Sequence, residues 1–94
     1  MAREGEPTIT VRVEVPEAWD VARFVVSPAT PARDLKLRAL QELAPDVRYA
    51  DDFVLKLRGW EVLDEAASLA DVGVLDGSIL LLTSRRKRPV RRGG

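Results

Sequence analysis

Apolar and polar residues alternate near the start of the chain, and this pattern predicts a β-hairpin. Residues 8–15 alternate without interruption, with the two-residue period of a half-buried strand. Residues 16–20 break the pattern as a turn, and residues 21–27 resume it. The side chains that we expect to face the core are those of Ile9, Val11, Val13 and Val15 in the first strand and of Ala22, Phe24 and Val26 in the second.

The apolar spacing changes to that of a helix after residue 30. Thr30 is a suitable N-cap, and Pro31 suits the first helical position because its missing N–H has no partner there. Apolar residues then recur at intervals of three and four until Pro45 ends the run. The pattern predicts one amphipathic helix of about three to four turns. Its buried side consists of Ala32, Leu35, Ala39, Leu40 and Leu43.

Two further strands follow the predicted helix. Residues 53–58 alternate and stop at Gly59, and residues 61–69 form a loop with a short strand near Val62. Residues 78–83 are a nearly continuous apolar run, which fits a central strand covered on both faces. This order of elements predicts an α+β protein with a β-grasp fold, in which one main helix lies across a mixed sheet of four to five strands.

The ends of the chain differ in composition from the part between them. We expect a disordered leader at residues 1–7, the β-grasp domain at 8–84 and a flexible basic tail at 85–94. Six of the fifteen basic residues lie in the tail, so residues 1–84 hold nine basic and fifteen acidic residues. The tail has no interleaved aromatic residue for base stacking. We therefore expect it to steer protein partners rather than to bind nucleic acid.

The composition narrows the chemistry that this chain can perform. It has no cysteine and no histidine, which removes the thiolate nucleophile, the commonest general base and the commonest metal ligand. We expect no enzyme activity and no bound cofactor. The longest uninterrupted apolar run spans residues 79–82, far below the ~20 residues of a membrane span. We expect a cytoplasmic monomer that does not associate with a membrane.

The sequence ends with two glycines after two arginines. A Gly93-Gly94 end presents a carboxylate with no neighbouring side chain, so an enzyme channel can close tightly around the backbone. Gly94 lies eleven positions after Thr83, a reach of up to ~36 Å at ~3.3 Å per residue. Arg91 and Arg92 can pair with carboxylates that line such a channel. The end is a candidate substrate for activation by a partner enzyme.

Four stretches of the chain resemble the ubiquitin-like family in their order and spacing. They are the approach to the helix at residues 26–35, the third strand and its glycine at 55–59, the turn at 68–74 with Val72 in the position of the family's tyrosine, and the last strand at 76–82. Together with Gly93-Gly94 they resemble a prokaryotic ubiquitin-like modifier.

The resemblance implies a conjugation pathway. An activating enzyme would adenylate the Gly94 carboxylate with ATP and Mg²⁺, and the glycine would pass as a thioester to a conjugating enzyme and then to amines of target proteins as an isopeptide bond. A deconjugating peptidase is a further implied partner. Gly93 and Gly94 are then the attachment site, and Arg88, Arg91 and Arg92 the tail contacts to the activating enzyme. The possible acceptor lysines are Lys36, Lys56 and Lys87.

The resemblance also indicates a partner surface that differs from ubiquitin's. Lys56 stands where ubiquitin's apolar patch has isoleucine, Leu81 and Thr83 stand near its histidine and valine partners, and Trp60 replaces a chain-linking lysine. Two alternatives stay open. One is a sulfur carrier whose Gly94 becomes a thiocarboxylate. The other is a non-covalent binding module, because residues 71–78 also resemble ubiquitin-like domains associated with bacterial type VII secretion.

Two further groups of residues have a structural interpretation. For Trp19 and Trp60 we expect partial packing at the edge of the domain, with an exposed binding role as the alternative. The carboxylate pairs Asp51-Asp52 and Asp64-Glu65 are adjacent in sequence and have no metal-ligating neighbours. We expect both pairs only to solvate loops.

Overall fold

A computed structural model describes residues 7–84 of the 94-residue chain. Apart from Pro7, the predicted leader lies outside the described residues, and so does the whole predicted tail. The elements are, in chain order, β1 (Ile9–Val15), the 3₁₀ turn η1 (Pro16–Ala18), β2 (Asp20–Val26), α1 (Ala32–Leu43), the 3₁₀ turn η2 (Ala50–Asp52), β3 (Phe53–Leu57), β4 (Trp60–Glu61) and β5 (Ile79–Ser84).

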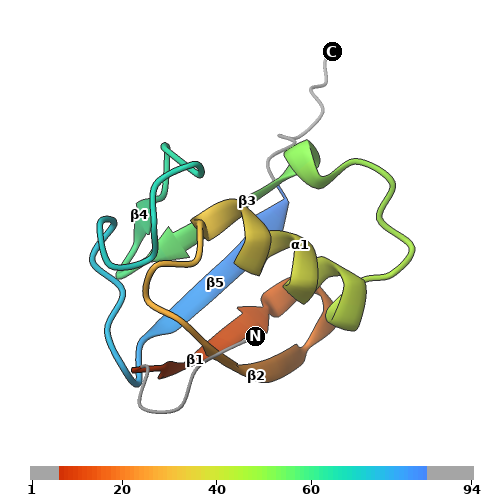
Figure 1. The fold of residues 1–94 in the computed structure, drawn as a ribbon. Coiled ribbons are helices and arrows are strands. Elements are labelled where there is room, and N and C mark those ends of the chain that lie inside the picture. Colours follow the sequence, from red (N-terminus) through yellow and green to blue (C-terminus); the bar gives the residue numbers. More distant parts are fainter. Residues whose placement is uncertain (1–6, 85–94) are drawn as a thin grey trace.

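The five strands form one mixed sheet in the order β2-β1-β5-β3-β4. β1 pairs antiparallel with β2 and parallel with β5, while β5 pairs antiparallel with β3. Helix α1 crosses one face of this sheet, as Figure 1 shows. The predicted fold class, an α+β β-grasp arrangement with one main helix, is confirmed.

The core lies between α1 and the covered face of the sheet. The inward side chains of β1 and β2 are as predicted at Val11, Val13, Val15, Phe24 and Val26, whereas Ile9 and Ala22 are only half-buried. The helix contributes Ala32, Leu35, Ala39 and Leu40 to this core. The amphipathic pattern of the sequence therefore located most of the hydrophobic core correctly.

The last strand is central, but only one of its faces is covered. Leu80 and Leu82 are fully buried under α1, whereas Ile79 is exposed and Leu81 is half-buried. The prediction that both faces of this strand are covered is wrong, because the described residues supply a helix layer on only one side of the sheet. The uncovered side is called the open face below.

Helix α1 begins one residue later than predicted. Pro31 is its N-cap and Ala32 its first residue, so the prediction of a Thr30 cap is wrong. The free N–H groups of the first turn find backbone acceptors instead. The Ala32 N–H donates to Ala67 O at 2.9 Å, and the Arg33 N–H donates to Glu65 O at 2.8 Å. These carbonyls replace a side-chain cap and tie the start of the helix to the loop before β5.

The two-residue turn between β3 and β4 gives a prediction about stability. Leu57 pairs with Trp60, and both central residues, Arg58 (φ 55°) and Gly59 (φ 86°), have the positive φ of a type I′ hairpin. Asparagine adopts this conformation more readily than arginine. We expect Arg58→Asn to raise the free energy of unfolding by about 0.5–1 kcal/mol and Gly59→Ala to lower it by about 1 kcal/mol, as urea denaturation would measure. Equal effects of the two changes would contradict this account of the turn.

Candidate partner-binding site

Three of the predicted partner-surface residues lie together on the open face. Lys56 of β3 is directly opposite Leu81 of β5. Thr83 follows Leu81 by two positions, so it lies on the same face of β5, and its partner on β3 is Val54. Side chains at opposite positions of neighbouring strands share a face and lie about 4.5–5.5 Å apart at Cβ. Lys56, Leu81 and Thr83 are all half-buried. They form one continuous surface, which we call the β3–β5 patch.

Carboxylates flank the β3–β5 patch on both sides. Glu61 of β4 is opposite Lys56, and Glu14 of β1 is in register with Leu81. The patch therefore has an aliphatic centre with a lysine and two glutamates around it. A partner surface that fits it would combine an apolar contact with charged groups of both signs.

Trp60 does not belong to this patch. Its cross-strand partner is Leu57, whose side chain faces the core, so Trp60 lies on the other side of the sheet from Lys56. The tryptophan is 78% exposed and lines a shallow groove of about 320 Å³ together with Leu63, which is 83% exposed. The structure thus divides the predicted surface into the β3–β5 patch and a separate Trp60–Leu63 groove.

The β3–β5 patch lies on the strand that leads into the tail. β5 ends at Ser84, which pairs with Phe53 at the first residue of β3, and Thr83 is the last patch residue before this end. The patch therefore lies beside the point where the described part of the chain ends. The other predicted site residues, Lys87, Arg88, Arg91, Arg92, Gly93 and Gly94, lie outside the described residues.

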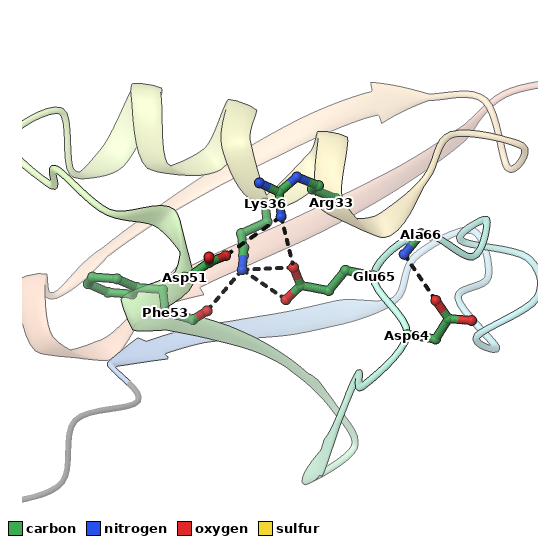
Figure 2. A network of polar contacts seen from close by, with 7 residues as sticks. All are labelled: Arg33, Lys36, Asp51, Phe53, Asp64, Glu65 and Ala66. Atoms are coloured by element: carbon green, nitrogen blue, oxygen red, sulfur yellow. Dashed lines mark hydrogen bonds and ion pairs between the residues drawn. The ribbon is translucent and has the colours of Figure 1, made fainter.

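Lys36 is buried, which corrects its prediction as an acceptor lysine. Its side chain is 1% exposed, and its Nζ atom donates to Phe53 O at 3.0 Å. The same Nζ atom lies 2.8 Å from each carboxylate oxygen of Glu65 (Figure 2). In the folded domain this amine is shielded from an incoming thioester, because it lies on the core side of α1. Its role is structural.

Glu65 likewise does more than solvate a loop. Its side chain is 16% exposed and neutralises the buried Lys36. Arg33 at the start of α1 lies 3.8 Å from Glu65 and 3.6 Å from Asp51. Figure 2 shows how these side chains join the helix, the loop before β5 and the start of β3. The prediction of simple loop solvation is wrong for Glu65, whereas Asp51 is 83% exposed and its ion pair with Arg33 lies at the surface.

Several exposed apolar side chains are binding candidates that the sequence reasoning missed or undervalued. Trp19 is 94% exposed at the tip of the β1–β2 hairpin, so the prediction that it packs partly on the domain is wrong. Val21 and Val25 are exposed at the outward positions of β2, and Ile79 is exposed on β5. The signal in the sequence was the valines at the outward positions of an alternating strand, where polar residues are usual.

Residues 7–84 contain no group of three or more carboxylate, histidine or cysteine side chains that is able to hold a metal ion. No helix in this part of the chain is both long and apolar enough to cross a membrane.

Comparison with known proteins supports the fold but does not define a family. No protein-family model matches the chain, and no curated protein sequence matches it either. Solved structures do match. The ubiquitin-like domain of an Arabidopsis thaliana protein superposes with a TM-score of 0.73 at 15% identity, over 97% of this chain and 92% of that one.

Two further matches come from an archaeon and a protozoan. The ubiquitin of Caldiarchaeum subterraneum gives a TM-score of 0.72 at 16% identity, over 86% of this chain and 98% of its own. A ubiquitin-like protein of Trypanosoma brucei gives a TM-score of 0.67 at 26% identity, over 84% of this chain and 96% of its own. The chain therefore has the ubiquitin-like fold.

Proposed function

We propose that this protein is a ubiquitin-like modifier of prokaryotic type, attached to target proteins through Gly94. One observation carries the proposal. A domain with the ubiquitin-like fold continues from its central strand β5 into a ten-residue basic segment with Gly93-Gly94 at its end. The β3–β5 patch lies beside the start of this segment, so one partner can hold the domain and the glycines at the same time. The protein acts as a substrate in the pathway and catalyses no step.

The chemistry starts once Gly94 is the terminal residue, either as synthesised or after cleavage of a precursor. An oxygen of its carboxylate attacks the α-phosphorus of ATP, and pyrophosphate leaves. The Mg²⁺ ion that stabilises this transfer belongs to the activating enzyme. A cysteine thiolate of that enzyme then displaces AMP to give a thioester, which passes to a conjugating enzyme. A target amine finally displaces the thiolate and forms an isopeptide bond.

The residues of this chain have distinct parts in the proposal. Arg88, Arg91 and Arg92 pair with carboxylates along the channel of the activating enzyme. Leu81, Thr83 and the Lys56 side chain form the docking contact on the domain. Lys56 and Lys87 remain as acceptor lysines if the protein modifies copies of itself, since Lys36 is buried. The protein works as a monomer in the cytoplasm, and a deconjugating peptidase releases it from its targets.

Mass spectrometry of the protein and its adducts from the native host tests this function. Trypsin cleaves after Arg92, so every modified target lysine should keep Gly93-Gly94 as a branch. Branched peptides of this kind are the expected result. Replacement of one terminal oxygen by sulfur, without branched peptides, would instead identify a sulfur carrier. An unmodified terminus together with a co-purifying, non-covalent partner would identify a binding module and refute both covalent functions.

A further inference from the structure

Two arginines face each other on the open face, and neither forms an ion pair with a carboxylate of residues 7–84. Arg12 of β1 is directly opposite Arg23 of β2, and both side chains are exposed. Like charges at directly opposite positions of an antiparallel pair destabilise a sheet. Within residues 7–84, neither guanidinium is among the side chains that form ion pairs. Residues 7–84 therefore keep a repulsive pair that none of their ion pairs neutralises.

Exposed apolar side chains flank this arginine pair on β2 and β5. Val21 and Val25 lie on either side of Arg23 along the same face of β2, and Ile79 of β5 is in register with Arg12. β2 is an edge strand of the sheet, so a partner can approach this surface from the side as well as from above. Apolar side chains around a cationic centre make a surface that can desolvate and hold a charged group.

Trp19 extends this surface at the hairpin tip. It has a φ of 54°, in the left-handed region that a bulky residue rarely adopts, and its side chain is almost fully exposed. It lines a shallow hollow of about 450 Å³ with Glu14, Val15, Pro16, Asp20 and Val21. The backbone strain costs stability, and in the free domain burial of the indole does not offset it. Tryptophan and arginine are the residue types that most often dominate binding energy at interfaces.

We propose that Trp19, Val21, Arg23 and Val25, together with Arg12 and Ile79, bind a protein segment in which a carboxylate side chain lies between apolar side chains. The carboxylate accepts hydrogen bonds from both guanidinium groups, and the apolar neighbours cover the two valines and the indole. This interaction is non-covalent and does not depend on Gly94, so it stands or falls separately from the proposed conjugation.

Charge favours an acidic protein segment over a nucleic acid. Residues 7–84 hold eight basic and thirteen acidic residues, and Glu14 is in register with Val21 beside the arginine pair. A polymer with a charge on every phosphate would meet this negative surface around the two arginines. A single carboxylate between apolar groups fits the pair without that repulsion.

The substitution Arg23→Glu separates a binding role from a structural one. It replaces the repulsive pair with an attractive one, so the domain should become more stable, with a rise in Tm of about 2–6 °C. The same change should abolish binding of the acidic segment. Arg48→Glu, which alters the charge equally in a distant exposed loop, should leave binding within about twofold. A variant that is more stable but no longer binds the peptide is expected only if the arginine pair binds a partner.

The binding probe is a twelve-residue peptide with one glutamate between valines, and its control carries a lysine in place of the glutamate. The full ¹⁵N-labelled chain should show amide shifts confined to residues 10–14 and 19–25 with the acidic peptide only. Arg23→Gln should weaken this binding about tenfold. In a Trp60→Phe background, Trp19 fluorescence should shift to shorter wavelength on binding.

Three results would overturn the proposal. The first is that the amide signals of this face do not shift at millimolar concentrations of the acidic peptide. The second is equal binding of the lysine peptide. The third is tighter binding of a ten-nucleotide single-stranded DNA or of phosphatidylserine vesicles to the same residues, which would assign the surface to a polyanion instead.

Discussion

Replacing Lys36 with alanine should lower the free energy of unfolding by about 3 kcal/mol, because it leaves the Glu65 carboxylate without its main partner. The Glu65 side chain is only 16% exposed, and Arg33, at 3.8 Å, is the other cation near it. The substitution also removes the buried stem of the lysine, and the Phe53 carbonyl loses a donor. For a domain of this size the loss is a large share of a total of about 5–15 kcal/mol. Urea denaturation followed by circular dichroism measures it.

A double substitution distinguishes loss of the ion pair from loss of packing. Lys36→Met combined with Glu65→Leu removes both charges and keeps most of the buried volume. Replacing a whole buried pair with apolar residues is often neutral or stabilising. The free energy of unfolding of this variant should therefore be at most about 1 kcal/mol below that of the original protein, or higher than it. Lys56→Ala is the matched control for loss of a lysine, and we expect it to change stability by less than about 1 kcal/mol. A Lys36→Ala variant as stable as Lys56→Ala would show that the buried pair contributes nothing.

The helix shows what hydrophobic spacing can and cannot predict. The stripe of Ala32, Leu35, Ala39 and Leu40 was predicted and is buried. Lys36 occupies the same side of the helix, but a search for apolar residues passes over it. Its burial depends on Glu65, which lies 29 positions later in the chain and meets it only in the folded structure. Long-range pairing of this kind leaves no local signal in a single sequence.

The division of the predicted partner surface has a simple geometric cause. In a continuous strand, residues 56 and 60 would point to the same face, because side chains alternate with a period of two. The two-residue turn at Arg58 and Gly59 reverses the chain between them, so Lys56 is opposite Glu61 and Leu57 is opposite Trp60. Trp60 therefore lies away from the patch. The sequence located the turn, but the exact pairing across it decides which side each residue occupies.

The open face was missed for a related reason. A continuous apolar run predicts that a strand is buried, but it does not say how many layers cover the sheet. Residues 79–82 are all apolar, and yet Ile79 is exposed because the only helix in the described part of the chain covers the opposite face. The Arg12–Arg23 pairing likewise follows from the length of the hairpin turn. In the sequence, each arginine by itself looks like an ordinary outward-facing residue of its strand.

Removing Gly93 and Gly94 should abolish every covalent adduct of this protein while leaving the domain intact. The deleted residues follow the last strand by more than eight positions, so Tm should stay within about 2 °C of its original value. The chain would end at Arg92, whose side chain does not fit a channel that closes around bare backbone. Expression of the shortened and the full chain in the native host, followed by denaturing gels and peptide mapping, measures the adducts directly.

A second deletion shows whether the glycines or the length of the segment matter. Removing Pro89 and Val90 shortens the reach by ~7 Å but keeps the Arg91-Arg92-Gly93-Gly94 end. We expect this variant to form the same adducts, at a lower rate if the activating enzyme needs the full reach. If the deletion of Pro89 and Val90 abolishes the adducts as well, the length of the segment limits attachment. Adducts that persist without Gly93 and Gly94 would contradict attachment through Gly94, because the carboxylate at Arg92 would then be the one joined to the target amine.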